Sequence, residues 1–334
     1  MKLKNLALAA LSTLTMPLAL VLAVSGGVMA QSTPDSYPTK PVKIMVGYGP
    51  GGTGDLTVRL VAQKLSDKLG QPFVIENRPG AGGIVASQIA QQAAPDGYTL
   101  NFIAAGNFAM TPALFKSLPF DPAKDFEMVS MIGSFGFVLA VDAKAQIKDA
   151  ADFIAQAKAN PGKLSIATIS VGSAQFLAAE VFKSMAKIDV AIIPYKTSAD
   201  VIRALRAGDV QAIFETIAPV MPQYKAVAVQ ILGVSEEQRF SGLPSVPTIA
   251  ESGLPGYAIN GWNGLAVPAK TPRDVIAKLN AEINAAVAQP DIKQKFIDLG
   301  VTARGNTPEQ MLALLRKDIS WWREVIEKAK IEKQ

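Results

Sequence analysis

Two glycine-rich segments contain the residue types best suited to binding an anion. The first runs from Gly47 to Asp55 (GYGPGGTGD) and the second from Asn77 to Gly83 (NRPGAGG). Each follows an apolar run and precedes a helical pattern, so each should leave backbone N–H groups free at a helix N-terminus. A helix N-terminus carries about half a positive charge, which attracts an anion without an Arg or Lys side chain. Together the two segments predict half of a carboxylate-binding cleft.

The chain contains no Cys and no His. Their absence removes the Ser-His-Asp triad, the cysteine nucleophile, thiolate or imidazole zinc sites and the usual proton shuttle at neutral pH. We therefore expect binding without catalysis, with no catalytic residue, metal, cofactor or disulfide. An exported enzyme that uses carboxylates or a Ser-Lys pair stays open as an alternative.

The first glycine segment also matches two nucleotide-binding motifs. Gly47–Gly52 reads GxGxxG after a strand, and Glu76 ends the next strand, as in dinucleotide-binding proteins. Pro50 stiffens that turn, and an exported compartment is poor in nicotinamide cofactors, so an exported nucleotide-binding oxidoreductase is kept only as an alternative. Half of a P-loop begins at Gly49, but Asp55 stands where the motif needs Lys and would repel phosphate.

The first thirty residues have the features of a signal peptide. Lys2 and Lys4 give a basic start, Leu6–Val24 is apolar, and a small-residue VMA site precedes Gln31. A membrane anchor is the alternative, but Pro17 and the small residues after the apolar run favour cleavage. We therefore expect an exported, periplasmic protein with residues 1–30 removed.

Composition indicates a packed globular protein without a nucleic-acid partner. Apolar residues make up 49% of the chain, and 33 basic residues face 28 acidic ones. Without Lys2 and Lys4 the balance is 31 against 28, or +3. These charges are scattered, with no dense basic run and no interleaved aromatic residues, so nucleic-acid binding has little support.

The first half of the chain predicts a parallel βαβαβ unit. Its expected strands are 42–46, 73–76 and 98–104, and its expected helices run from 56 to 69, with Asp55 at the N-cap, and to about 93. Ala105–Thr111 then interrupts the pattern at the carboxyl end of the third strand. Ligands of open α/β sheets bind at such strand ends, so Ala105 and Asn107 should belong to the same cleft.

The second half predicts a similar series. Met128–Gly133 and Phe137–Val141 should be two short strands that flank a glycine-containing hinge. The further expected strands are 164–168, 190–194, 210–214, 227–234 and 261–267, and the further helices are 149–159, 174–186, one ending at 207–209, 275–288, 291–299 and 308–330. Two similar α/β lobes joined by crossing strands predict a hinged binding protein.

Several of these stretches recur in a known family. They are YPTKPVKIMV (37–46), PGGTGD (50–55), ENRPGAGG (76–83), PDGYTL (95–100), FDPAKDF (120–126), PGKLS (161–165), IPYK (193–196) and LPSVPTIAESGLPGY (243–257). In this order and spacing the chain resembles the solute receptors of tripartite tricarboxylate transporters, also called Bug-type periplasmic receptors. The match covers nearly the whole mature chain.

The resemblance implies a two-lobed type II periplasmic-binding-protein fold (Venus flytrap), in which each lobe is a mostly parallel sheet flanked by helices. Lobe 1 would comprise 37–135 plus about 230–334, and lobe 2 would comprise 136–229. A monomer would close on a small organic carboxylate or a related amide. It would then deliver that solute to a membrane complex of one large and one small subunit.

The resemblance also implies how the ligand is held, by main-chain amides and ordered water from the two glycine segments. It transfers that role to Tyr48, Gly51, Gly52, Asp55, Gly82 and Gly83, and we add Thr53. The second lobe would contribute Thr168, Ser170, Ser173, Thr197 and Glu215 when it closes. This chain departs from the family pattern at Ala167–Leu177, at Thr197-Ser198 and at Glu215, so relatives do not identify its ligand.

Four side chains have competing interpretations. Asp55 is expected at a helix N-cap but could contact ligand, and Arg59 and Arg78 either reach the anion or only brace the loops. Glu215 either faces the cleft or serves as an acid at the next helix N-terminus. If it faces the ligand, it should meet a cation, an amide or a hydroxyl, because a bare carboxylate would be repelled.

A periplasmic sensor that passes the ligand signal to a partner protein is a further alternative, and it would share the same cleft.

Overall fold

The computed structural model describes residues 37–169, 171, 173–328, 331 and 333, which fall within one compact unit. The expected signal peptide, residues 1–30, lies outside the described residues. The strands are β1 (Val42–Val46), β2 (Phe73–Asn77), β3 (Thr99–Ala104), β4 (Phe126–Asp142), β5 (Ser165–Ile169), β6 (Ala191–Tyr195), β7 (Ala212–Thr216), β8 (Val229–Val234), β9 (Asn260–Pro268) and β10 (Thr302–Ala303).

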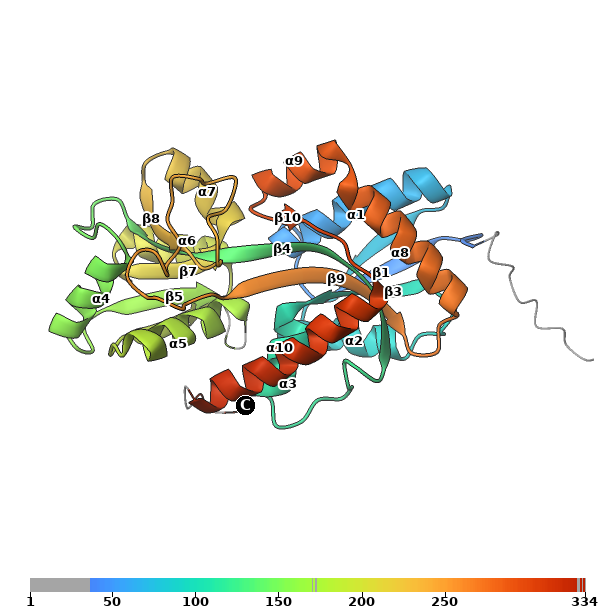
Figure 1. The fold of residues 1–334 in the computed structure, drawn as a ribbon, viewed down its shortest axis with the longest axis horizontal. Helices are drawn as coiled ribbons and strands as arrows, with labels where there is room; N and C mark the ends of the chain where they lie inside the picture. Colours follow the sequence, from blue (N-terminus) through green and yellow to red (C-terminus); the bar gives the residue numbers. More distant parts are fainter. Residues whose placement is uncertain (1–36, 170, 172, 329–330, 332, 334) are drawn as a thin grey trace, which may run out of the picture. The chain divides into compact units, whose positions relative to one another are not determined.

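The helices cover both faces of the sheet (Figure 1). They are α1 (Thr53–Leu69), α2 (Ile84–Gln91), α3 (Thr111–Leu114), α4 (Ala150–Ala159), α5 (Ala174–Ala186), α6 (Ser198–Ala207), α7 (Ile217–Lys225), α8 (Arg273–Ala288), α9 (Pro290–Asp298) and α10 (Pro308–Lys328), with a 3₁₀ turn η2 (Ala81–Gly83) and a π-helical turn η3 (Ala105–Met110). None of the helices in the described ranges is long and apolar enough to cross a membrane.

The sheet contains two parallel sets of strands separated by antiparallel ones. Its order is β2-β1-β3-β9-β4-β7-β5-β6, with β8 and β10 also paired to β4. β1 is parallel to β2 and β3, and β5 is parallel to β6 and β7. β4 and β9 run antiparallel to each other between the two sets (Figure 1). The predicted fold class, two α/β lobes joined by crossing strands, is confirmed, whereas the proposed lobe boundaries stay a prediction.

The two short strands predicted around a glycine hinge are wrong, because β4 is one continuous strand of 17 residues. Gly133 pairs with Asn263 and Gly136 with Asn260, so both glycines remain in the ladder with β9. The pairing instead shifts register near Ser130 and Gly133, as at β-bulges. The glycines allow close packing: a Cβ at Gly133 would lie 2.6 Å from Val301 Cγ1.

Burial explains why the helices form where they do. Val58, Val61 and Leu65 of α1 are almost fully buried at helical spacing, and they pack with β1, β3 and α8. A second cluster joins α2, η3 and α10 to α4 and α5, and a third joins α6 and α7 to β8. The carboxyl ends of both parallel sets are therefore held on rigid, packed elements.

Candidate functional site

The two glycine segments touch each other through their backbones. A Cβ atom at Gly47 would lie 2.4 Å from Cα of Gly83, so a side chain at Gly47 would require a backbone shift. Gly83 itself has φ 99°, a left-handed conformation that glycine adopts without strain. The proximity predicted for the two segments is therefore enforced by glycine.

The third loop, η3, closes against the second glycine segment. Asn107 is buried, and its Oδ1 accepts a hydrogen bond from the Ala104 N–H at 2.7 Å. A Cβ at Gly83 would lie 3.1 Å from Asn107 Nδ2, which has no hydrogen-bond partner among the described residues. Ala105, also predicted for the site, is buried on the same turn, and the phenol of Tyr48 is near Gly106.

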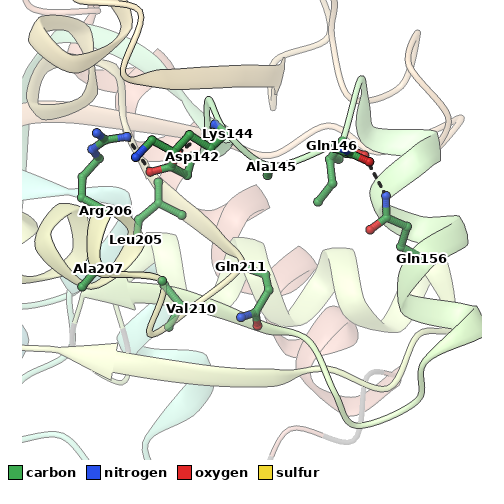
Figure 2. A pocket seen from close by; sticks show the side chains of 12 residues that line it. Asp142, Lys144, Ala145, Gln146, Gln156, Leu205, Arg206, Ala207, Val210 and Gln211 are labelled. Carbon is green, nitrogen blue, oxygen red and sulfur yellow. Dashed lines mark hydrogen bonds and ion pairs between the residues drawn. The ribbon is translucent and has the colours of Figure 1, made fainter.

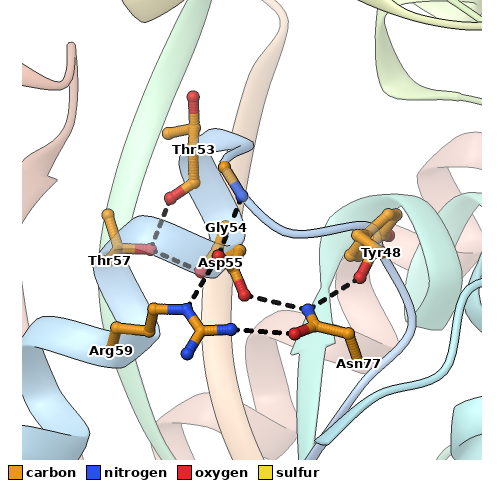
Figure 3. Close-up of polar contacts among 8 residues, drawn as sticks. Tyr48, Thr53, Gly54, Asp55, Thr57, Arg59 and Asn77 are labelled. Atoms are coloured by element: carbon orange, nitrogen blue, oxygen red, sulfur yellow. Dashed lines mark hydrogen bonds and ion pairs between the residues drawn. The ribbon is translucent and has the colours of Figure 1, made fainter. Parts of the chain in front are cut away.

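Asp55 shapes the first glycine segment (Figure 3). Its Oδ2 accepts the Gly51 N–H and Arg59 Nε, both at 2.9 Å, and its Oδ1 accepts Asn77 Nδ2 at 2.9 Å. Asn77 Nδ2 also donates to the Tyr48 carbonyl at 2.9 Å, which ties the first segment to β2. Burial alone would raise the pKa of Asp55, but the hydrogen bonds from Arg59, Asn77 and Gly51 hold it below its usual range.

The prediction that Asp55 is the N-cap of α1 is wrong. Gly52 is the N-cap, the helix begins at Thr53, and Asp55 lies in its first turn. The reason is that the Asp55 carboxylate reaches back to the Gly51 N–H, so the helix starts before it rather than after it. A direct contact between Asp55 and ligand stays a prediction.

The start of α1 borders open space. The N-cap residue, Gly52, has no side chain that could accept a hydrogen bond from the first turn of α1. A Cβ at Gly51, Gly52 or Gly82 would meet no heavy atom within 4 Å. The backbone of both glycine segments can therefore be approached closely by a small molecule, at the positive end of a 17-residue helix.

The two arginines near this region are paired within the protein. Arg59 Nη2 donates to Asn77 Oδ1 at 2.8 Å, in addition to its ion pair with Asp55. Arg78 pairs with Glu76 at 3.3 Å. Both arrangements match the bracing interpretation, in which the anion is left to main-chain N–H groups.

Across from the glycine segments lie the carboxyl ends of β5 and β7. Thr216, at the end of β7, places its Oγ1 3.5 Å from Oγ1 of Thr53, the first residue of α1. The turn η3 likewise packs against α5. Sequence reasoning did not include Thr216, although a hydroxyl residue at a strand end before a helix is a usable signal.

Two of the predicted hydroxyl residues have local partners. Ser173 caps α5 by accepting the Phe176 N–H at 3.1 Å, and it donates to the Ile169 carbonyl at 2.8 Å. Thr197 is exposed and caps α6 by accepting the Asp200 N–H at 3.1 Å. Ser170, a third predicted contact, lies outside the described residues. These bonds account for Ser173 and Thr197 structurally, and their contact with ligand stays a prediction.

Glu215 is fully buried at the end of β7. Its Oε1 accepts Gln175 Nε2 at 2.8 Å, the Thr216 N–H at 2.7 Å and the Thr216 hydroxyl at 3.2 Å. Its Oε2 has no partner among the described side chains and backbone groups. Burial raises the pKa of Glu215, against the opposing effect of hydrogen-bonding groups on Gln175, Thr216 and Ser198. Gln175 was not predicted, because its contact with Glu215 joins residues forty positions apart.

Three predicted site residues share one unusual property, and we call their atoms the unpartnered polar set: Asn107 Nδ2, Thr168 Oγ1 and Glu215 Oε2. Each belongs to a fully buried residue, and none has a hydrogen-bond partner in the described part of the chain. Buried polar atoms in folded proteins are nearly always paired, so each exception needs an explanation. A bound polar ligand would supply the missing partners of these three atoms, whereas Asn101 Oδ1 and Glu236 Oε2 belong to residues outside the predicted site and are also unpartnered in the described chain.

A separate hollow of about 420 Å³ lies at the other end of the β5–β7 strands (Figure 2). Asp142, Arg206 and Gln211 are among its lining residues, and none of the predicted site residues is. Arg206 donates to Asp142 and to the Ala228 carbonyl, and Gln211 Oε1 accepts the Ser165 N–H at 2.9 Å. These side chains of the hollow thus have hydrogen-bond partners within the protein, unlike the atoms of the unpartnered polar set. No group of three or more acidic residues in the described ranges could hold a metal ion.

Comparison with known proteins places this geometry in context. A family model described as "Tripartite tricarboxylate transporter family receptor" matches residues 57–331. Protein BugT of Bordetella pertussis is 32% identical over 303 residues, which cover 90% of this chain and 93% of BugT.

Two solved structures from Rhodopseudomonas palustris have the same fold. Rpa4515 with adipate has a TM-score of 0.83 and 31% identity, covering 89% of this chain and 99% of that one. MatC with bound malate has a TM-score of 0.78 and 30% identity, covering 87% of this chain and 100% of that one.

Proposed function

The chain belongs to the tripartite tricarboxylate transporter receptor family, and we propose that it captures a small organic carboxylate between the glycine segments and the β5–β7 strand ends. Receptors of this family are periplasmic solute-binding proteins of the Bug type and are not enzymes. The proposal concerns the ligand, its site and its delivery by this chain.

The unpartnered polar set carries the proposal. Its three atoms belong to residues at the carboxyl ends of strands or in the loop that follows one, and Asn107 Nδ2 lies beside Gly83 of the second glycine segment. A carboxylate at the start of α1 would accept backbone N–H groups near Gly52, because those of Gly51 and Gly83 already donate to Asp55 and to the Gly80 carbonyl. The rest of the ligand would then extend towards Asn107 and the β5–β7 edge. Adipate and malate in the two related structures are ligands of this kind.

Binding would be coupled to closure of the two lobes. The ligand first meets the glycine segments, because their backbone is already held in place by the bond from the Gly51 N–H to Asp55 and by the contact between Gly47 and Gly83. Thr168, Thr216 and Glu215 contribute in the closed arrangement, in which Thr216 Oγ1 lies 3.5 Å from Thr53 Oγ1. Affinity for the closed form must exceed affinity for the open form by a few kcal/mol for closure to become the dominant state.

We further propose the cellular role that the family description implies. The chain would be exported by the signal peptide at residues 1–30 and act in the periplasm as a monomer. It would hand its ligand to a transporter with one large and one small membrane subunit. Copurification of this chain with those subunits, strengthened by ligand, is the test of this part.

A ligand screen tests the proposed function directly. Purified protein is heated with mono-, di- and tricarboxylates, aromatic acids, amino acids and nicotinamide-type amides, and the hits are measured by isothermal titration calorimetry. We expect at least one small carboxylate to raise the Tm and to bind with one-to-one stoichiometry. Failure of every carboxylate, or enzymatic conversion of any of them, would overturn the proposal.

A further inference from the structure

Among the described residues, one oxygen of Glu215 accepts three hydrogen bonds and the other accepts none. Three hydrogens point at Oε1, from Gln175 Nε2 and from the N–H and hydroxyl of Thr216. The arrangement fixes the carboxyl group in one orientation, with Oε2 as the unpartnered atom. A rotation of the carboxyl group by half a turn would only exchange its two equivalent oxygens, and one of them would again face the three donors. The difference between the two oxygens therefore comes from the arrangement of the donors around Glu215.

The neighbours of Glu215 connect the β5–β7 side of the proposed site to the glycine-segment side. β7 ends at Thr216, whose hydroxyl lies 3.5 Å from that of Thr53 at the start of α1. Gln175 holds Glu215 from the first turn of α5, and α5 packs against η3, the loop that carries Asn107. Glu215 therefore lies where the two sides of the proposed site meet, at its β5–β7 end.

Within the described ranges, no cationic side chain faces Glu215. The groups that face it are Gln175 from α5, Ser198 from α6 and Thr216 at the start of α7, and none of them titrates near neutral pH. Its partner residue on β4 is Val138. Among the ion pairs of the described residues none includes Glu215, and Asp200 on α6 is paired with Arg203. Burying an ionised carboxylate without a partner is costly, so a hydrogen must reach Oε2 from elsewhere.

We propose that Glu215 sets the specificity of the site for the far end of the ligand, by admitting only ligands that place a hydrogen on Oε2. This rests on the proposed function. An ω-ammonium group supplies that hydrogen itself. A dicarboxylate supplies it only when one proton, taken from solvent, sits between Oε2 and the ligand oxygen. The state in which both carboxylates are ionised is excluded by their mutual repulsion.

Replacing Glu215 by Gln reverses this preference. The Gln Oε1 can accept the same three donors, and the Nε2 then takes the place of Oε2 and donates to the ligand. The opposite orientation is disfavoured because it would place the amide nitrogen against three donors. Glu215→Gln should therefore accept an ionised second carboxylate without a proton and should reject an ammonium group.

The test compares matched ligands that differ only at the far end. Glutarate and 4-aminobutyrate, with the shorter and longer homologues of each, are titrated calorimetrically into the wild type and Glu215→Gln from pH 6 to 9.5. For the wild type we expect dicarboxylate affinity to fall by up to tenfold per pH unit at the alkaline end. For Glu215→Gln the profile should be flat, and selectivity at pH 9 should shift at least tenfold towards the dicarboxylate. Calorimetry in two buffers of different ionisation enthalpy should show proton uptake in the wild type alone.

Glu180→Gln is the control, since Glu180 is a partly buried carboxyl on the same helix as Gln175 whose pKa is also raised by burial. It should leave both profiles unchanged. Identical pH profiles and selectivity in the wild type and Glu215→Gln would overturn the inference alone, provided that the ligands bind. If no carboxylate of the series binds, the inference fails, whereas the proposed function fails only if the wider carboxylate screen is also negative.

Discussion

The two sides of the proposed site use different chemistry. The glycine-segment side offers backbone N–H groups, and its charged side chains are paired with one another, as Asp55 is with Arg59. The β5–β7 side offers side chains, and two of them, Thr168 and Glu215, have buried polar atoms without partners among the described residues. Backbone N–H groups recognise any carboxylate, whereas unpartnered side-chain atoms discriminate between ligands. Affinity should therefore depend most on the first side and selectivity on the second.

The largest expected effect is loss of all binding from the glycine-segment side. Gly52→Trp places a bulky side chain where a Cβ meets nothing within 4 Å and where φ of −76° suits any residue. The fold should therefore be retained, while the approach to the start of α1 is blocked. We expect at least a hundredfold loss of affinity for every carboxylate, measured by calorimetry, with a Tm within a few degrees of the wild type.

Lys68→Trp is the matched control, because Lys68 is exposed in the last turn of the same helix. It adds the same side chain far from the glycine segments and should bind like the wild type. Gly83→Trp is a poorer probe, since Gly83 has φ 99° and its Cβ would press on Asn107. Full affinity in a folded Gly52→Trp protein would remove the glycine segments from the site.

The next effect should appear when Asp55, which shapes that side, is removed. Asp55→Ala leaves Asn77 Nδ2, Arg59 Nε and the Gly51 N–H without their acceptor. We expect unfolding free energy to fall by about 2–4 kcal/mol in urea titrations, and affinity to fall with it because the loop loses its fixed shape.

The sign of the pH dependence separates Asp55 from the acids whose pKa is raised. The pKa of Asp55 is lowered in the folded state, so its contribution to stability is present above the unfolded pKa. That contribution is lost as pH falls through the lowered folded pKa. The stability difference between the wild type and Asp55→Ala should shrink in acid, and a constant difference down to pH 2 would contradict this account.

Between the two sides, Glu236 at the crossing strands should respond to pH in the opposite direction. Its side chain packs against Gly136 of β4, its Oε2 is buried without a partner in the described chain, and burial raises its pKa to about 7. The folded state thus holds its proton up to a higher pH than the unfolded state does. Stability should fall as pH rises from about 4.5 to about 7 and stay level above.

Glu236→Gln removes this dependence. The variant should gain about 2 kcal/mol relative to the wild type between pH 5 and pH 8, which urea titrations at the two pH values can measure. Glu237→Gln changes the exposed neighbouring acid and should follow the wild type. Parallel curves for the wild type and Glu236→Gln would show that the carboxyl is hydrated rather than buried.

The contrast between the two sides also explains what the sequence could predict. The glycine-segment side is formed by neighbouring residues: a strand, a glycine segment and a helix follow one another within Val42–Leu69. Its position and its exposed N–H groups can therefore be predicted from consecutive residues. The β5–β7 side depends on contacts between residues that are far apart in the sequence. Glu215 was predicted from its place at a strand end, but its saturated oxygen depends on Gln175, which only the fold brings near.

The errors have the same origin. Glycines in Phe126–Asp142 looked like a hinge, because their pairing with β9 involves residues more than a hundred positions away. Asp55 looked like an N-cap, because helix periodicity does not show that its carboxylate reaches back to the Gly51 N–H and also accepts Asn77 Nδ2. Patterns in consecutive residues predicted the helices and strands, whereas hydrogen bonds formed in the folded chain determined what individual residues such as Asp55 do.

The smallest expected effects come from two hydroxyl residues of the β5–β7 side, and they sharpen the comparison most. Thr168→Val replaces a fully buried, unpartnered hydroxyl by a methyl of similar size, so stability should be unchanged or rise by up to about 1 kcal/mol. Affinity should nevertheless fall about tenfold if the hydroxyl meets the ligand. Ser173→Ala instead removes the N-cap of α5 and should lower stability by about 1 kcal/mol with little change in affinity. Denaturant titration and calorimetry on both variants test this. If Ser173→Ala loses more affinity than Thr168→Val, unpartnered atoms do not mark the ligand-facing surface, and the selective side must be redrawn around the helix caps.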